Sequence, residues 1–463
     1  MGENFMNENK KKRLGLTGAL MVAMFGLSSA AHADGHLKLP IGEGEFNWDS
    51  YNAFAKEHDY SGQKLTIYGQ WAGGDAEGFE TVIAYFEEAT GADVSYVSGG
   101  GEYSQDLLVN VEGGSPPNIA FHALPGLAAD MAKRGFLTKL DPGTADWLRD
   151  NYAAGKSFVD LATFAGQDGN NALYGFAYNQ QVKSLVWYSP ENFEDAGYEV
   201  PQTMEDLQAM NDQIVADGGT PWCIGIASGA YTGWPASDWV EDMMLRTQPP
   251  EVYDQWVRNE IPFDDPRVVA AIEEFGAFAR NDKYVAGGAS QVASGDWKDS
   301  PKGLFDSPPQ CYMHRAASYI TGFFPEGTIV GEDADFFYFP AYANKDLGKP
   351  VLGAGGFMFI TKDSPAAHGF IEYLKTPIAQ EINMSQMMFL TAHKHVNGAV
   401  ASSQTQTKLN EILLNATTFR FDASDLMPSA VGAGTFWTGM VDYVGGKDAA
   451  AVARDIDKGW DNQ

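Results

Sequence analysis

The apolar positions in the first part of the chain follow two different periods in turn, which predicts alternating strands and helices. Three short apolar runs bounded by turn residues predict strands, at residues 65–68, 92–97 and 118–121. Between the first two runs, apolar residues recur at helical spacing, and we expect Asp75 to cap this helix and Gly91 to end it. A second helix is expected over 126–134. This order predicts a parallel sheet with right-handed crossovers.

A second set of strands and helices begins near residue 184. Strands are predicted at residues 184–188 and 223–227, and helices at 190–196, at 203–215 and from about 237. Thr203 is a typical N-cap, because Glu205 and Asp206 follow it in the first helical turn. We therefore expect a second α/β unit, again with a parallel sheet.

Extended segments connect the two units. Residues 173–179, 336–340 and the glycine-containing stretch 350–357 suit a chain that crosses between two lobes and forms a hinge. The first lobe is expected at residues 34–178 and 353–396, the second at 182–350 and 400–463, and the crossovers near 179–181, 351–352 and 397–399.

The N-terminus has the three parts of a secretory signal peptide. Four basic residues at 10–13 precede an apolar stretch at 14–27, and Ala31 and Ala33 supply the small residues that a signal peptidase reads. The apolar stretch is shorter than the ~20 residues that span a bilayer. We expect cleavage of residues 1–33, a chain that begins at Asp34, and export to the periplasm.

Composition and charge limit the classes of molecule that this chain can bind. The 463 residues are 44% hydrophobic and 13% aromatic, so the chain can bury a large core. A formal charge of −30 argues against nucleic acid and anionic lipid as partners, since both are recognised by basic surfaces.

Two cysteines, Cys223 and Cys311, are the only ones in the sequence. In an oxidising compartment two thiols more often pair than stay free, so a disulfide is expected, with two separately buried thiols as the alternative. They are too few and too far apart for a zinc site, and the histidines show no HExxH spacing. Neither a metal nor a cofactor is expected.

Aromatic and polar residues recur at the expected strand ends and loops. In an α/β sheet, ligands bind beyond the carboxyl ends of the strands. Flat aromatic rings interleaved with hydrogen-bonding side chains suit a neutral sugar, whose ring faces stack and whose hydroxyls donate and accept. The candidate ligand-binding residues are Trp71, Tyr103, His122, Asn179, Trp234, Asp238, Arg315, Gly355 and Trp437.

Among these candidates, the turn around Trp234 gives the strongest signal, because Gly233 and Pro235 flank it and Asp238 lies close by in sequence. We expect Trp234 to stack on the sugar ring and Asp238 to accept hydroxyl hydrogen bonds. Trp71 and Tyr103 would close over the opposite side. Arg315 either donates to sugar oxygens or pairs with a carboxylate.

Several short motifs follow one another along the chain, at residues 69–71, 84–91, 113–118, 133–137, 184–188 and 353–356. Their order resembles that in the bacterial solute-binding proteins of sugar ABC transporters. Residues 233–239, 420–428 and 436–439 resemble more specifically the alpha-glucoside-binding proteins of that family. Asn118 departs from the family pattern, which has Asp after the second Pro.

The resemblance implies a two-lobe periplasmic-binding-protein fold of class II, like that of maltose-binding protein. It also implies a monomer that binds an alpha-glucoside or a similar oligosaccharide between its lobes and delivers it to the membrane permease of an ABC importer. Such a protein is not an enzyme.

Two other functions stay open from the residues. A secreted glycoside hydrolase also combines aromatic rings with two carboxylates, and Asp238 and Asp242 could supply them. A binding protein for a charged sugar derivative could use Arg315 or Arg420 to meet the anion.

Overall fold

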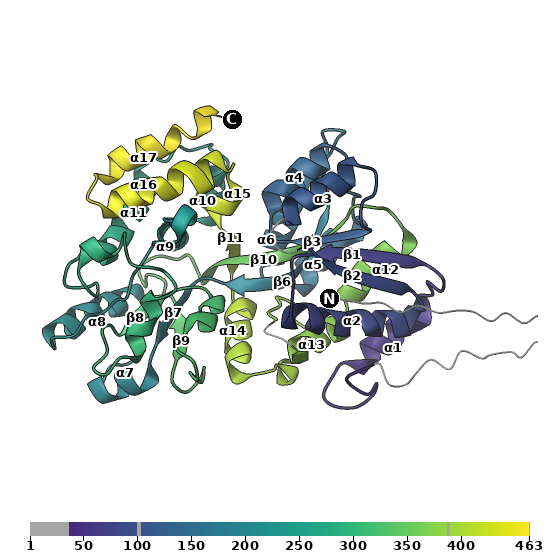
Figure 1. Ribbon diagram of the computed structural model, residues 1–463, viewed down its shortest axis with the longest axis horizontal. Helices are drawn as coiled ribbons and strands as arrows, with labels where there is room; N and C mark the ends of the chain where they lie inside the picture. Colours follow the sequence, from purple (N-terminus) through teal and green to yellow (C-terminus); the bar gives the residue numbers. More distant parts are fainter. Residues whose placement is uncertain (1–36, 100–102, 387–388, 463) are drawn as a thin grey trace, which may run out of the picture.

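The computed structural model describes residues 37–99, 103–386 and 389–462 of the chain. The expected signal peptide and its cleavage site lie outside these residues. Within the described segments, no helix is both long and apolar enough to cross a membrane. Figure 1 shows two bodies side by side, with β6 (Gly175–Val182) and β10 (Pro350–Ile360) running between them.

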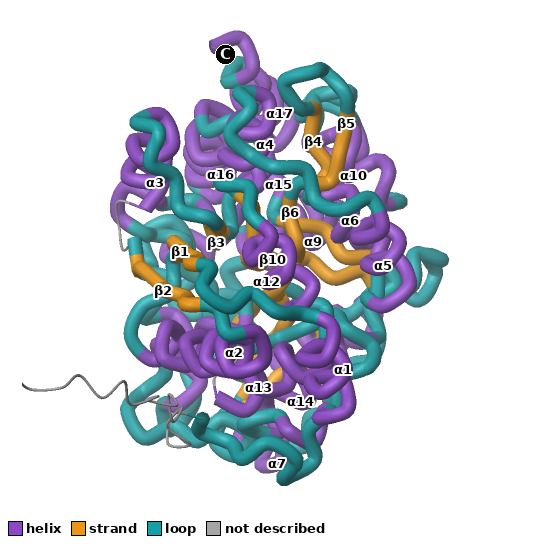
Figure 2. Tube along the Cα trace, turned by 90° about the vertical axis from the view of Figure 1, so that its right-hand side faces the viewer, coloured by secondary structure: helices purple, strands orange, loops and turns teal. Residues whose placement is uncertain are grey.

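The larger sheet is built as the hydrophobic pattern predicts. Its strands β1 (Lys64–Gly69), β2 (Asp93–Ser98) and β3 (Ile119–His122) are parallel, with β1 in the middle. The helices α2 (Gly74–Thr90) and α3 (Tyr103–Glu112) lie between them in the chain. Figure 2 shows these strands, with β6 and β10, between one group of helices that includes α3 and α4 (Pro125–Lys133) and another that includes α1 (Trp48–Glu57) and α2.

Strand β10 joins the two bodies. Its first residues pair in parallel with β11 (Thr418–Phe421), and its last residues pair antiparallel with β3. Strand β6 runs antiparallel beside it over most of its length. Glycines make this pairing possible, because a Cβ atom at Gly355 would lie 2.4 Å from the carbonyl oxygen of Asn179. Gly355 thus serves a close approach of two crossing strands.

The second sheet differs from the expectation. Its strands β7 (Leu185–Tyr188), β8 (Met313–Arg315) and β9 (Asp335–Tyr338) are all antiparallel, whereas a parallel sheet was expected. Residues 223–227, expected as a strand, make only one isolated bridge, at Ala227, and Trp222 just before them makes two. The segments that pair here are distant in sequence, and a local apolar pattern does not specify the direction of their pairing.

Helices make up most of the remaining structure. In addition to α1–α4, they are α5 (Gly143–Asn151), α6 (Gly155–Leu161), α7 (Pro190–Ala196), α8 (Met204–Ala216), α9 (Trp234–Thr247), α10 (Pro250–Val257), α11 (Pro266–Ala279), α12 (Pro365–Leu374), α13 (Pro377–Gln386), α14 (Gln404–Leu414), α15 (Ala423–Leu426), α16 (Trp437–Val444) and α17 (Ala449–Asp457). A small hairpin joins β4 (Thr163–Ala165) to β5 (Asn171–Leu173).

The predicted N-cap residue is right for α8 and wrong for α2. Thr203 caps α8 in a reciprocal capping box with Asp206, as predicted. Asp75 does not cap α2. The N-cap is Gly73, and Asp75 lies within the first turn, where its charge still faces the positive end of the helix dipole.

The apolar core divides into two clusters. The first packs around β1, β3, β6 and β10 and includes Leu409 of α14 and Phe421 of β11. The second packs around α9, α11, α16 and α17. After β11, the buried apolar residues from Ala423 onward belong to it. The chain therefore passes from one cluster to the other directly after β11. The lobe boundaries given above remain a prediction.

Candidate functional site

A cavity of about 200 Å³ lies where the start of α9, the end of β6 and the segment after β11 meet. It combines two tryptophans and a tyrosine with three carboxylates, an amine and a hydroxyl. Its lining residues are Lys183, Trp234, Asp238, Tyr319, Asp422, Ser424, Asp425 and Trp437. This is the mixture of flat apolar faces and hydrogen-bonding groups that a polyhydroxylated ligand requires.

A glycine turn brings the two tryptophans to the same cavity. Gly233 precedes α9 with a φ of 112°, a conformation that side chains rarely adopt. A Cβ atom there would lie 2.2 Å from the carbonyl oxygen of Trp437. Because only glycine allows this approach, the first turn of α9, with Trp234, packs closely against the start of α16, with Trp437.

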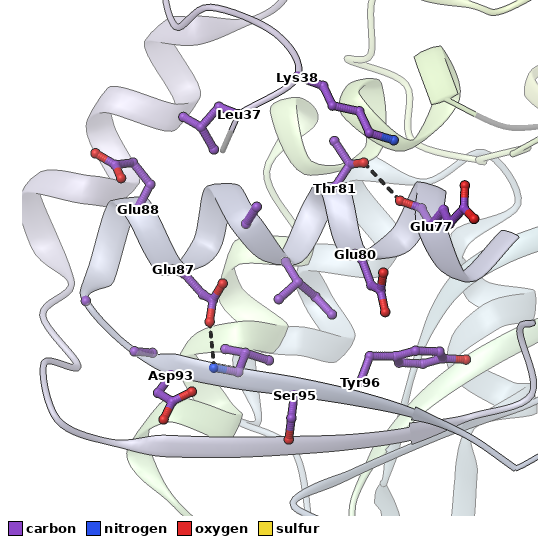
Figure 3. Close-up of a pocket in the computed structure, with 15 residues that line it drawn as sticks. Leu37, Lys38, Glu77, Glu80, Thr81, Glu87, Glu88, Asp93, Ser95 and Tyr96 are labelled. Carbon is purple, nitrogen blue, oxygen red and sulfur yellow. Dashed lines mark hydrogen bonds between the residues drawn. The ribbon is translucent and has the colours of Figure 1, made fainter. Parts of the chain in front are cut away.

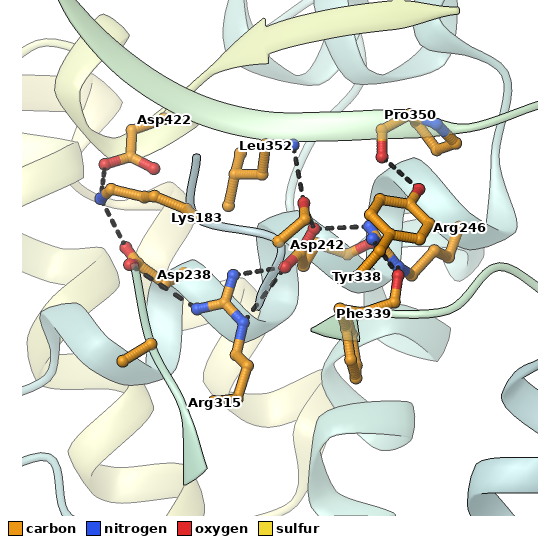
Figure 4. Close-up of polar contacts among 12 residues, drawn as sticks. Lys183, Asp238, Asp242, Arg246, Arg315, Tyr338, Phe339, Pro350, Leu352 and Asp422 are labelled. Carbon is orange, nitrogen blue, oxygen red and sulfur yellow. Dashed lines mark hydrogen bonds and ion pairs between the residues drawn. The ribbon is translucent and has the colours of Figure 1, made fainter. Parts of the chain in front are cut away.

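The floor of the cavity is ionic (Figure 4). The Nζ atom of Lys183 lies 3.2 Å from Asp238 Oδ1 and also donates to Asp422 Oδ2. One carboxylate oxygen of each of Asp238, Glu241 and Asp422 comes within 4.8 Å of the others, and the Lys183 ammonium pairs with Asp238 and Asp422. One buried amine, directly after the crossing strand β6, thereby connects helix α9 with the segment after β11.

A second row of ion pairs lies behind this floor. Arg315 Nε donates to Asp242 Oδ2 at 3.1 Å, and Ser184 Oγ donates to Asp242 Oδ1 at 2.7 Å. Arg246 pairs with the same carboxylate and donates to the carbonyl oxygen of Phe339 at 2.6 Å. Since every one of these groups is buried, the partners stabilise each other's charge in the absence of water.

Burial sets the protonation of the floor. Burial raises the pKa of Asp238 to about 7, although the neighbouring Lys183 opposes this. For Lys183, burial lowers the pKa, but Asp238 and Asp422 outweigh it and hold the pKa well above its usual range. The amine is therefore charged at neutral pH.

Of the residues predicted from sequence, Trp234, Asp238 and Trp437 line this cavity. Arg315 lies directly behind it, with Nη1 3.7 Å from Asp238 Oδ2. Asp238 was expected as an acceptor open to the ligand. Instead it is only 3% exposed, and its oxygens face Lys183 and Arg315.

The other five predicted residues lie elsewhere, away from this cavity. Trp71 is 9% exposed and packs on Phe121 with ring centroids 4.0 Å apart. Tyr103 was expected at a strand end, but it begins α3 and stacks on Tyr68.

The remaining three of these residues lie on the crossing strands and β3. His122 is fully buried against Phe359, and its burial lowers its pKa to about 3. Asn179 and Gly355 belong to the paired strands β6 and β10.

Sequence reasoning missed five residues that line the cavity, namely Lys183, Tyr319, Asp422, Ser424 and Asp425. A signal for some of them was present. The motif over 420–428 contains three of the five, and Lys183 directly precedes the motif over 184–188. The abundance of acidic residues in this chain concealed the two aspartates, Asp422 and Asp425, in the motif over 420–428.

A larger hollow of about 830 Å³ lies on the other body (Figure 3). It runs between α2 and the edge strand β2, and its labelled side chains include Glu77, Glu80, Glu88 and Asp93. Among the described residues that line it, Tyr96 is the one aromatic side chain, and it donates its hydroxyl to the carbonyl oxygen of Trp71. This acidic groove lacks the paired stacking faces that suit a sugar, so the smaller cavity is the candidate site.

The two cysteines form a disulfide beside this site. Cys223 and Cys311 are bonded, with Cα atoms 5.5 Å apart. The carbonyl oxygen of Cys223 also accepts from His314 Nδ1 at 2.8 Å. The bridge joins the segment that leads into α9 to the start of β8.

Known proteins resemble this chain over most of its length. The family model for the bacterial extracellular solute-binding protein matches residues 72–381. The alpha-glucosides-binding periplasmic protein AglE of Rhizobium meliloti is 60% identical over 92% of this chain and 93% of its own. The osmoprotective compounds-binding protein GgtB of Synechocystis is 39% identical over 87% and 93%. RafE from Streptococcus pneumoniae, at 16% identity, shares the fold with a TM-score of 0.69 over 87% of this chain and 98% of its own.

Proposed function

The chain belongs to the family of bacterial extracellular solute-binding proteins, and from that membership we propose that its solute is an α-glucoside bound between Trp234 and Trp437. The observation that carries this proposal is the cavity itself, in which two indole rings face a charged floor. The name of the relative that is 60% identical, an alpha-glucosides-binding protein, supports the same solute.

The chemistry of the cavity suits a neutral sugar. An indole ring covers the apolar face of a pyranose, while carboxylates accept from its hydroxyls and an ammonium donates to its oxygens. The Nε1–H of Trp437 is buried and has no acceptor among the described residues. These groups recognise hydroxyl positions without requiring a charged ligand.

The size of the cavity suggests how much of the solute it encloses. Sites for small molecules usually measure roughly 300–1,000 Å³, and this cavity measures about 200 Å³. We infer that it holds one sugar ring, and that the rest of the glycoside extends between the two bodies. Rotation about the crossing strands β6 and β10 would open and close that space.

The remaining parts of the proposal concern delivery. We infer export with removal of residues 1–33, a monomeric chain, and transfer of the solute to the permease of an ABC importer. Relatives in a periplasmic and extracellular family support export.

A second candidate solute is an osmoprotective compound, favoured by the 39% identical relative of that name. A charged sugar derivative is less well supported, because both candidate arginines already have carboxylate partners. Arg315 pairs with Asp242, and Arg420 Nε donates to Asp254 at 2.7 Å.

Thermal unfolding of the chain from Asp34 onward tests the proposal. Maltose, trehalose and sucrose are the α-glucosides, cellobiose and lactose are matched β-linked controls, and glycine betaine is a zwitterionic osmoprotectant. A bound solute at 100 times its Kd stabilises the folded state by ~2.7 kcal/mol. We expect this stabilisation with at least one α-glucoside and with neither β-linked sugar. Stabilisation by glycine betaine alone would favour the second candidate, and release of free glucose would indicate a hydrolase.

A further inference from the structure

The buried ionic cluster under the cavity has one negative charge too many. Three of its side chains are cationic, namely Lys183, Arg246 and Arg315, and four are acidic, namely Asp238, Glu241, Asp242 and Asp422. All seven are almost completely buried. Burying an unbalanced charge is costly, so the cluster requires one more positive charge or one neutral acid.

The cations serve only part of the cluster. Asp242 forms ion pairs with both arginines, and Asp238 lies between Lys183 and Arg315. Asp422 accepts a hydrogen bond from Lys183, but only on its Oδ2 atom. Glu241 forms an ion pair with none of the three cations. Its Oε1 accepts from the backbone N–H of Ser424 at 3.0 Å.

Two carboxylate oxygens are left over, one on each of the neighbouring acids. Within the described part of the chain, no N–H or O–H group donates to Glu241 Oε2 or to Asp422 Oδ1. Glu241 is 0% exposed and Asp422 is 2% exposed, so these carboxylates are withdrawn from bulk solvent. Both acids belong to the group whose carboxylates approach one another within 4.8 Å.

We propose that Glu241 and Asp422 share a single proton at neutral pH, held between Glu241 Oε2 and Asp422 Oδ1. Two buried carboxylates without a cation between them cannot both ionise, and one proton turns their repulsion into a hydrogen bond. The same proton supplies the missing positive charge. Burial raises the pKa of Asp238 as well, but both Asp238 oxygens face a cation, whereas Glu241 Oε2 and Asp422 Oδ1 have no donor among the described residues, so the proton belongs between those two.

The surroundings of the pair support this assignment. Burial, followed by the charges of Asp422 and Asp238, raises the pKa of Glu241 well above its ordinary value. Burial likewise raises the pKa of Asp422, and Asp425 on α15 adds to the effect while Lys183 opposes it.

The other ionisable groups near the pair do not supply a positive charge or a hydrogen bond in place of the proton. Tyr253 on α10 donates its hydroxyl to the carbonyl oxygen of Phe421 at 2.9 Å and is therefore engaged elsewhere. Tyr319 lines the cavity above Lys183, and Arg315 and Arg246 are directed to Asp242. None of these groups brings a cation to Glu241.

The proton links the cavity to pH, a consequence that rests on the proposed function. Asp422 lines the cavity, and Glu241 lies behind it. When the pair loses its proton, a second negative charge appears beneath the solute and competes for Lys183. We therefore expect capture of the solute to weaken at alkaline pH.

The variant Glu241→Gln tests the proton directly, because an amide is permanently neutral and can still donate to Asp422 Oδ1. In the wild type, the folded state holds one proton more than the unfolded state between the unfolded and folded pKa of the pair. The unfolding constant of the wild type, relative to that of Glu241→Gln, should therefore rise about tenfold per pH unit from about pH 5 upward. Urea unfolding across this range measures the ratio.

Glu273→Gln is the matched control, since Glu273 is an exposed residue of α11 and the change in net charge is the same. Its ratio to the wild type should stay flat. A flat ratio for Glu241→Gln as well would overturn the proposal.

Infrared spectroscopy of the wild type and of Glu241→Gln gives a second test. A band of a protonated carboxyl should persist in the wild type above about pH 6, where exposed carboxyls are ionised, and should be weaker in Glu241→Gln. Asp238, whose pKa burial raises to about 7, is present in both proteins, so a band of equal strength in both would contradict the shared proton. Calorimetry with maltose at neutral and alkaline pH then tests the link to capture. No binding at any pH would contradict the proposed solute, while unfolding and infrared data would still decide the proton.

Discussion

Two aromatic groups in this protein have the same sequence signature and different surroundings. Trp71 and Tyr103 follow strands of the first sheet, and Trp234 and Trp437 follow glycine-containing turns of the second body. The first two are buried among other rings, with Trp71 5.0 Å from Phe79 between centroids. The second two are half-buried and face a cavity with an ionic floor.

The difference teaches that the neighbours of an aromatic ring decide its role. The Trp71 ring packs among the apolar and aromatic side chains of its core. The Trp234 ring lies with its centroid 5.8 Å from the ammonium of Lys183, and it lines the same cavity as Asp238. A ring beside hydrogen-bonding groups offers a ligand both stacking and polar contacts, whereas a ring among rings stabilises the fold.

The largest expected effect is on stability, at Trp71. Trp71→Ala removes a large buried ring and should lower the free energy of unfolding by ~3–5 kcal/mol. Urea unfolding of the variant without solute measures this loss. Affinity for the α-glucoside should change little where the variant remains folded. A variant of normal stability that no longer binds would place Trp71 in the site.

The next effect is on affinity, at Trp234. Trp234→Ala removes a stacking face and should weaken binding by one to two decades in Kd, about 1.4–2.8 kcal/mol. Calorimetric titration gives the affinity, and the melting temperature without solute should fall only slightly, because the ring is half-buried.

Ile329→Ala is the control, since Ile329 is an exposed apolar residue (53% exposed) that does not line the cavity. It should change neither quantity. A Trp234→Ala variant that binds normally but melts much earlier would reverse the comparison and make Trp234 a core residue.

The sequence predicts the first sheet well because its order is local. The helices α2 and α3 each lie in the chain between two consecutive parallel strands, so apolar spacing and turn residues are sufficient. The second sheet pairs Leu185 with Tyr338 and Val186 with Arg315, which are more than a hundred residues apart. No local pattern contains that pairing, and the expected parallel sheet was wrong.

In the candidate site, only the proximity of residues that lie close together in the sequence could be predicted. Trp234 and Asp238 lie in one helix start, so their proximity could be read from the sequence. Lys183 and Asp422 meet across 239 residues, and Glu241 is one acid among 61. The ionic floor depends on these long-range contacts, which is why sequence reasoning treated Asp238 as a free acceptor.

The smallest effects come from removing a single oxygen from each group. Tyr103 donates its hydroxyl to the carbonyl oxygen of Tyr68 at 3.3 Å, and that residue of β1 also pairs with its neighbours in the sheet. Since the carbonyl keeps sheet partners, Tyr103→Phe should cost only about 0.5–1 kcal/mol of stability, with no change in affinity.

Tyr319→Phe is the matching change in the cavity, where the ring is half-buried beside Lys183 and Asp238. A sugar hydroxyl that bonds to the Tyr319 hydroxyl would lose one neutral hydrogen bond, worth about 0.5–1.5 kcal/mol, so Kd should rise by at most about tenfold. Stability without solute should stay within about 0.5 kcal/mol of the wild type, as for a substitution that leaves the packed core unchanged. Urea unfolding and calorimetry on both variants would show opposite patterns, one losing stability and the other affinity. If both variants lost stability alone, Tyr319 would belong with Tyr103 among the core rings, and the contrast between the two groups would rest on the tryptophans only.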